Sequence, residues 1–437
     1  MNNTAEVYLW GTRIGIIHQE PGRSYAAFEY DREFLKSGIE PAPIKMPLGG
    51  TVYEFPQLSG ETFHGLPGLV ADSLPDKFGN KVIEQWLVSQ GRSLKDFNAI
   101  DRLCYTGKRG MGALEYVPAV SEIGDIDEEI NVSEMVRFAS DILNKRKSVV
   151  LNAKEKLTYS QLVQVGSSAG GARAKALIAW NEKTGEIRSG QSDLDKDYEY
   201  WLLKFDNVSN NGDHGENDKP EYTLIEYAYY KMALDAGITM NECKIYDSGN
   251  EHHFMTKRFD RVNGQKIHMQ TLGALAHIDY NEPGICSYEL AAGYMRSIGI
   301  SEKEIEQFFR RMVFNCAAVN QDDHVKNISF LMDRNGKWSL SPAYDITFSY
   351  NPDNRWLRAH QMTVNNKTQH ITAADLIQAG TTMGIRSKKC MYIIEQVCSV
   401  VERFSEYAAA ADISEERFER IDQVIRSNDL KVLSKEL

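Results

Sequence analysis

The segment FNCAAVNQDDHVKNISFLMDRNGKWSLSPAYD, residues 314–345, decides the fold. Asp322 stands five positions before Asn327, and Asp345 comes eighteen positions after Asn327. Between the last two, residues 328–332 form an apolar run of strand length, residues 333–336 have the composition of a turn, and a second short strand begins at Trp338. The pattern predicts a hairpin with Asn327 at its start and Asp345 just past its end, so that both oxygen ligands face one cleft, as a hard cation requires.

The spacing of these three residues is the one that protein kinases use for phosphoryl transfer. In kinases an aspartate accepts the hydroxyl proton of the substrate, while an asparagine five residues later and a further aspartate hold magnesium. The alternative interpretation is that Asp322 and Asp323 end a helix in solvent and that Asp345 is an ordinary loop acid. For any one of these residues alone, the alternative is favoured. The presence of Asp322, Asn327 and Asp345 together at the kinase spacing favours kinase chemistry.

Length and composition indicate an ordinary soluble globular protein. The chain has 437 residues, of which 42% are hydrophobic and 25% charged, which predicts about two to three domains. No apolar run approaches the roughly 20 residues that span a bilayer, and residues 1–10 lack the features of a signal peptide, so we expect a cytoplasmic protein. Six scattered cysteines without a Cys-x-x-Cys pair predict reduced thiols and no structural zinc.

The net charge of −11 argues against a protein that binds nucleic acid by itself. Neutralising phosphates requires a basic face, and none is evident in the sequence. Contact with DNA through a partner stays open.

A glycine-rich segment, VQVGSSAGGARAKALIAW at residues 163–180, precedes a predicted strand. Such turns let backbone N–H groups approach phosphate oxygens, and Arg173 and Lys175 would add positive charge. A plain hairpin or loop is the alternative. The next strand, predicted at 198–205, contains Lys204, where kinases keep the lysine that pairs with nucleotide phosphates. A helix at 222–236 would place Glu226 where it could pair with Lys204.

The sequence resembles the HipA family of bacterial toxin kinases from near residue 5 to about residue 425. The resemblance rests on VGSSAGGARAK (165–175), WLLKFD (201–206), KRFDR (257–261), DDHVKN (322–327) and SPAYD (341–345), and on GLPGLVADSLPDKFGNKVI (65–83) and GMGALEYVP (110–118). It implies an α+β, two-lobed protein-kinase-like fold, distantly like phosphoinositide kinases. The implied parts are a β-rich N-terminal subdomain (1–155), an ATP-binding small lobe with a Gly-rich loop (156–255) and a mainly helical catalytic lobe (256–437).

The resemblance also implies roles for matching residues. Asp322 would be the catalytic base, Asn327 and Asp345 the Mg²⁺ ligands and Lys204 the phosphate-contacting lysine, with His324 and Lys326 beside them on the catalytic loop. Ser168 would be an autophosphorylation site, with Ser167 as a competing acceptor. The residues implied to bind ATP are Ser168, Gly170, Gly171, Ala172, Arg173, Lys175, Lys204, Lys257, Arg258, Phe259, His324, Asn327 and Asp345.

The sequence departs from the family pattern at two places. Lys257 stands where a glutamate is expected at the adenine-binding hinge, so main-chain contacts there could survive but a carboxylate contact could not. Ala169 and Gly170 replace a typical leucine and proline in the loop.

The implied reaction is transfer of the ATP γ-phosphoryl group to a serine or threonine hydroxyl. The implied partners are a HipB-like helix-turn-helix antitoxin, through which DNA is reached indirectly, and a protein substrate, with an aminoacyl-tRNA synthetase among the candidates. Two alternatives stay open: a catalytically weak interaction protein that bridges antitoxin dimers on DNA, and a small-molecule kinase.

Overall fold

The computed structural model describes residues 2–89, 91–120, 128–143, 160–166, 173–192, 194–206, 208, 221–428 and 430. The chain divides into two compact units. The first unit contains residues 1–220, 244–270 and 332–336, and the second contains residues 221–243, 271–331 and 337–437. The domain boundaries predicted near residues 155 and 255 stay predictions.

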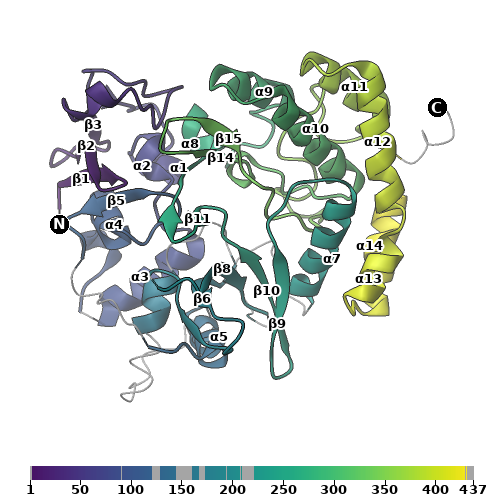
Figure 1. The fold of residues 1–437 in the computed structure, drawn as a ribbon, viewed down its shortest axis with the longest axis horizontal. Helices are drawn as coiled ribbons and strands as arrows, with labels where there is room; N and C mark the ends of the chain where they lie inside the picture. The colour runs from purple at the N-terminus through teal and green to yellow at the C-terminus, as the bar shows by residue number, and fades with distance from the viewer. Residues whose placement is uncertain are drawn as a thin grey trace. The chain divides into compact units, whose positions relative to one another are not determined.

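An antiparallel sheet begins the first unit, with strand order β4-β3-β2-β1-β5 (Figure 1). Its core face follows from alternation along β1, where Ala5, Val7 and Leu9 are buried between more exposed residues. The apolar patterns of the sequence predict strands near residues 7–10, 13–18, 25–30 and 114–117, and the structure confirms all of them. Their bounds are β1 Thr4–Leu9, β2 Thr12–His18, β3 Ala27–Tyr30, β4 Tyr53–Glu54 and β5 Leu114–Val117.

Short helices accompany this sheet. The helical pattern predicted over residues 69–90 is present but is divided near Pro75 into α2 (Gly68–Ala71) and α3 (Lys77–Ser89), since proline disrupts a helix interior. The other helices are α1 Gly60–Phe63, α4 Ala99–Thr106 and α5 Val132–Leu143, with 3₁₀ turns η1 Phe34–Ser37 and η2 Leu94–Asp96.

A second five-stranded sheet of the first unit has the order β7-β6-β8-β10-β9. Apolar residues of α3 and α5, including Trp86 and Met135, pack in one core with Ile178 and Trp201 of the sheet. The predicted strands at 176–180, 198–205 and 254–259 are confirmed with shifted ends. The bounds are β6 Lys175–Trp180, β7 Ile187–Ser189, β8 Glu199–Lys204, β9 Cys243–Ser248 and β10 Glu251–Lys257, followed by β11 Arg261–Val262, β12 Gln265–Lys266 and β13 His268–Thr271.

The second unit is mainly helical, and α10 is its central element. Helix α10 (Glu302–Ala317) begins at a capping box between Ser301 and Glu304, as predicted, and packs against α9 and α12 (Figure 1). Its own buried phenylalanines, Phe308, Phe309 and Phe314, contribute to the core. The other helices are α7 Tyr222–Asp235, α8 Leu272–Ala276, α9 Tyr288–Ser297, α11 Ala373–Thr382, α12 Ser387–Val401, α13 Phe404–Ala410 and α14 Glu415–Arg426.

The predicted hairpin follows α10. Strands β14 (Ser329–Met332) and β15 (Trp338–Leu340) are neighbours in one sheet. The turn between them closes through the N–H of Gly336, which donates to the carbonyl of Asp333 at 3.0 Å, and Gly336 has a φ of 79°, a conformation that favours glycine. The mixed α+β class is therefore confirmed. Among the described residues, no helix combines the length and apolar character needed to cross a membrane.

Two buried histidines of the first unit predict an acid-sensitive fold. His268 and His253 are fully buried, and burial lowers the pKa of each from 6.5 to about 4. Both rings are therefore neutral in the folded protein, whereas the unfolded chain binds protons below about pH 6.5. The stabilisation is complete above that pH and is lost as the pH falls towards 4. We expect each histidine to remove roughly 2 kcal/mol of unfolding free energy between pH 7 and pH 5.

Denaturant unfolding of His268→Gln at pH 7 and pH 5 tests this expectation. The variant should lose less stability than the wild type on acidification, and the exposed-site control His18→Gln should behave like the wild type. An unchanged pH dependence in His268→Gln would show that burial of this ring is not responsible.

Candidate active site

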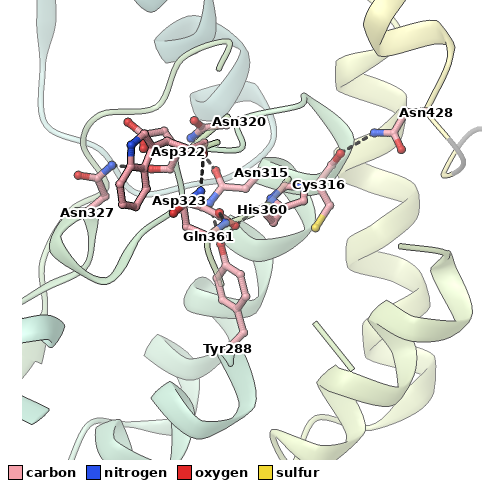
Figure 2. Close-up of polar contacts among 11 residues, drawn as sticks. Tyr288, Asn315, Cys316, Asn320, Asp322, Asp323, Asn327, His360, Gln361 and Asn428 are labelled. Atoms are coloured by element: carbon pink, nitrogen blue, oxygen red, sulfur yellow. Dashed lines mark hydrogen bonds and ion pairs between the residues drawn. The ribbon is translucent and has the colours of Figure 1, made fainter. Parts of the chain in front are cut away.

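The segment after α10, residues 319–327, carries the predicted catalytic residues and is called the Asp322 loop. It leaves the helix at Val319, whose φ of 55° turns the chain, and it ends in the 3₁₀ turn η3 (Val325–Asn327). The side chain of Asp322 is 29% exposed, so its carboxylate is accessible. The Asn327 Nδ2 donates to the Asp322 carbonyl at 2.8 Å (Figure 2). This bond fixes the amide and leaves its Oδ1 atom to accept a cation.

His324 and Lys326 are brought together beside Asp322. The His324 Nδ1 accepts the N–H of Lys326 at 3.2 Å, so the proton of the neutral ring is on Nε2, which lies 3.8 Å from Asp322 Oδ1. Tyr280 contacts both residues: its ring centroid lies 5.7 Å from that of His324 and 5.0 Å from the Lys326 Nζ. Tyr280 was not predicted from the sequence, because no short spacing connects it to the loop.

Tyr344 ties the second predicted metal ligand to the same loop. Its hydroxyl donates to the carbonyl of Lys326 at 2.7 Å and shares a hydrogen bond with the hydroxyl of Ser329 at the start of β14. Asp345, the next residue, has a φ of 52°, which is uncommon for a residue other than glycine and is typical of functional positions. Tyr344, the neighbour of Asp345, is thus bonded to Lys326, the neighbour of Asn327. That both oxygen ligands face one cleft stays a prediction.

The oxygen donors fit Mg²⁺ better than a transition metal. Magnesium takes one or two protein carboxylates or carbonyl oxygens and completes its octahedron with water and substrate phosphates. Across the described part of the chain, no group of three or more His, Cys, Asp and Glu side chains is arranged to hold a metal. Asn327 and Asp345 are the two oxygen donors that the sequence predicts for such an ion.

The position of Asp323 contradicts the alternative interpretation that this residue is part of a solvated helix end. A solvated helix end would expose it, but Asp323 is 3% exposed and lies beyond the end of α10. Asp322 is partly exposed while its chain neighbour Asp323 is buried, so the loop turns one acid towards solvent and the other into the core.

The two lysines predicted to bind phosphate, Lys175 and Lys204, lie in the first unit. Lys175 begins β6 and Lys204 ends β8, and they are direct partners in the antiparallel register, so their side chains share one face. The Lys175 Nζ lies 3.4 Å from Asp76 Oδ2, and both side chains are buried. The Lys204 Nζ lies 5.8 Å from the centroid of Phe254. Lys175 is therefore buried beside a carboxylate, whereas Lys204 is partly exposed.

The glycine-rich loop falls mostly outside the described residues. This applies to Ser167, Ser168, Gly170, Gly171 and Ala172, and Arg173 is the first described residue after them. Lys204 and Glu226 belong to different units, and their pairing stays a prediction.

At the predicted hinge, side chains are engaged within the first unit. The Lys257 Nζ pairs with Glu199 Oε1 at 2.5 Å. The Arg258 guanidinium is buried and donates to both carboxylate oxygens of Asp260, at 2.9 and 2.7 Å. Burial alone would raise the pKa of Asp260, but the charge and hydrogen bonds of Arg258 lower it. The main-chain N–H of Arg258 donates to the carbonyl of Tyr200 at 2.9 Å, and Phe259 is partly exposed.

Comparisons with known proteins agree with this geometry. Residues 5–117 match the family model of the HipA N-terminal domain, and residues 167–404, more than half of the chain, match the HipA-like C-terminal domain. A putative kinase of Haemophilus influenzae is 28% identical over 162 residues, which are 32% of this chain and 47% of that protein. The chain thus spans about half the length of this curated relative.

Solved structures give the fold. HipA of Shewanella oneidensis MR-1, solved with HipB and its operator DNA, has a TM-score of 0.68 at 17% identity, covering 98% of this chain and 96% of that chain. The Helicobacter pylori kinase CtkA has a TM-score of 0.30 at 13% identity, covering 51% of this chain and 92% of that chain, which is too low to support an argument.

Proposed function

Because the chain belongs to the HipA family, we propose that it is a kinase that transfers the γ-phosphoryl group of ATP to a serine or threonine hydroxyl of a protein. The main support is the arrangement of Asp322, Asn327 and Asp345 in the second unit. The Asn327 side chain bonds to the main chain of Asp322, and Tyr344, next to Asp345, bonds to the same loop. This set provides a base and two oxygen ligands for a cation.

In the proposed reaction, Asp322 accepts the proton of the acceptor hydroxyl as its oxygen forms a bond to the γ-phosphorus. The bond from that phosphorus to the β,γ-bridging oxygen breaks, and ADP leaves with the electron pair. Asn327 and Asp345 would hold Mg²⁺, which neutralises phosphate charge when bound. Lys204 and Lys175 would bind phosphate oxygens, so most of the catalysis would come from positioning and charge stabilisation.

His324 and Lys326 would complete the catalytic side. The His324 Nε2 lies 3.8 Å from Asp322 Oδ1 and would help to orient that carboxylate. The Lys326 ammonium, placed against Tyr280, would offset charge on the transferring group. At the hinge, Lys257 replaces the expected glutamate, and the Arg258 side chain is paired with Asp260. Neither side chain therefore offers a carboxylate to the adenine, which favours recognition by main-chain groups.

For the biological role, we propose the toxin of a toxin-antitoxin pair with a HipB-like helix-turn-helix partner. The solved Shewanella complex of HipA, HipB and operator DNA supports a partner of this kind, and the net charge of −11 fits indirect contact with DNA. Labelled ATP supplied to the purified protein with a cell extract, and separately with metabolites, tests the substrate class. Labelled protein supports the proposal, labelled metabolites indicate a small-molecule kinase, and no label indicates an interaction protein.

Ser168 is expected to become phosphorylated by the protein itself. It lies in a glycine-rich segment that would approach the phosphates of ATP, and phosphoserine adds about −1.5 to −2 charges. Beside a triphosphate this charge is repulsive, so affinity for ATP should fall as the modification accumulates. Incubation with Mg-ATP followed by mass spectrometry should locate phosphate on Ser168.

Two variants control this experiment. Asp322→Asn should leave the loop unmodified, and Ser167→Ala should still be labelled at Ser168. An active kinase whose loop never carries phosphate, or carries it only on Ser167, would refute the assignment.

A further inference from the structure

Directly behind the catalytic aspartate is a buried polar network centred on Asp323 (Figure 2). Its Oδ2 accepts the Tyr288 hydroxyl at 2.8 Å and lies 2.9 Å from the His360 Nδ1. Its Oδ1 accepts the main-chain N–H of Gln361 at 2.7 Å. Three donors from two parts of the second unit that are far apart in sequence therefore converge on one buried carboxylate.

The pair between Asp323 and His360 is ionic. Burial alone would lower the pKa of His360, but the charge of Asp323 and its hydrogen bond raise that pKa well above the usual value. Both groups are almost inaccessible, with side-chain exposures of 6% for His360 and 1% for Asp323. A buried charge pair of this kind resists rearrangement, because separating it leaves two uncompensated charges.

A second layer connects the pair to α10 and to the start of the loop. The Asn315 Nδ2 donates to the Tyr288 hydroxyl at 3.0 Å, and the Asn320 Nδ2 donates to the Asn315 Oδ1 at 3.0 Å. Asn320 lies two residues before Asp322. The network thus holds the Asp322 loop by hydrogen bonds at Asn320 and at Asp323, on either side of Asp322.

We propose, resting on the function proposed above, that Asp323 is a positioning residue whose buried carboxylate holds the Asp322 loop in the arrangement that presents Asp322 to the acceptor hydroxyl. Asp323 touches no substrate in this account. It acts through its chain neighbour, because the buried bonds of Asp323 and of Asn320 hold the main chain on either side of Asp322.

Asp323→Asn tests the proposal, because it keeps the shape but places an NH₂ donor where one oxygen accepted hydrogen bonds. We expect kcat for phosphoryl transfer to fall by roughly 100-fold, the scale of a small misplacement of a catalytic group. The affinity for ATP in the absence of magnesium should change little, since Lys175 and Lys204 of the first unit are assigned to the phosphates. Tyr288→Phe, which removes one donor of the three, should lose less.

Asp375→Asn is the matched control for general destabilisation. Asp375 is buried in the same unit and accepts hydrogen bonds from Lys367 Nζ at 2.8 Å, Thr372 N–H at 2.9 Å and Asn365 Nδ2 at 2.9 Å. Its amide variant should melt at a lower temperature than the wild type but keep the wild-type kcat. A loss of kcat in Asp375→Asn as large as in Asp323→Asn would overturn a specific role for Asp323.

A double variant tests whether the pair acts as one unit. Asp323→Asn combined with His360→Gln should be no slower than Asp323→Asn alone, since coupled residues give non-additive losses. Multiplied losses would show two independent roles and would contradict the proposal.

Hydrogen exchange without nucleotide separates this proposal from the proposed function. The amides of residues 319–327 should exchange faster in Asp323→Asn than in the wild type, and at the wild-type rate in Asp375→Asn. Unchanged exchange in Asp323→Asn overturns the positioning role whether or not the chain is a kinase. Absence of transfer by the wild type overturns the function and leaves the exchange result to decide the positioning role.

Discussion

Asp322→Asn is expected to slow phosphoryl transfer by roughly 100-fold to 10,000-fold, the scale of a positioned general base. The amide has nearly the shape of the carboxylate but cannot accept the proton of the acceptor hydroxyl. The main-chain carbonyl of Asp322, which accepts the Asn327 amide, is retained, so the loop and its metal ligand should keep their places. Initial rates with labelled ATP, together with calorimetry of nucleotide binding, measure both properties.

A nearby exposed acid supplies the control for Asp322. Asp353 lies on the surface of the second unit, and Asp353→Asn should transfer phosphate at the wild-type rate. Wild-type turnover in Asp322→Asn would remove Asp322 from the mechanism, and loss of nucleotide binding in that variant would indicate a structural role instead.

Loss of Asp345 is expected to weaken Mg-ATP binding by at least about 10-fold, because even indirect disturbance of a metal site costs that much. The positive φ of Asp345 makes the choice of variant important. Asparagine tolerates this conformation and removes only the charge, whereas alanine adds backbone strain. We therefore expect Asp345→Asn to lose affinity while keeping its melting temperature.

Magnesium dependence isolates the metal contribution. Calorimetry in magnesium and in a chelator should show a large difference between wild type and Asp345→Asn only when magnesium is present. Asn327→Ala should show the same effect more weakly. Unchanged Mg-ATP affinity in both variants would place the cation elsewhere.

The hairpin and α10 could be predicted because their signals are local. The capping box at Ser301, the turn before Gly336 and the apolar runs beside it all act within a few residues. Helix α4 also carries a local signal, a capping box between Asn98 and Asp101, which the prediction did not use. Helix α5 was missed as well, although its buried residues recur at helical spacing.

The support of the site could not be predicted, because it depends on distant pairs. Asp323 meets Tyr288 and His360 across 35 and 37 positions, and Lys175 meets Asp76 from another part of the first unit. No short motif encodes such contacts. The spacing of Asp322, Asn327 and Asp345 therefore indicated the chemistry, while the fold determines which neighbouring acid faces solvent and which is buried.

The most direct test of the central claim is transfer of the labelled γ-phosphate of ATP by the purified chain to a protein hydroxyl, followed by identification of the modified residue. Label is expected on serine or threonine with wild type and magnesium, and none above background with Asp322→Asn or with a chelator. Equal labelling by Asp322→Asn, or no transfer by the wild type to itself or to any protein of a cell extract, would contradict it.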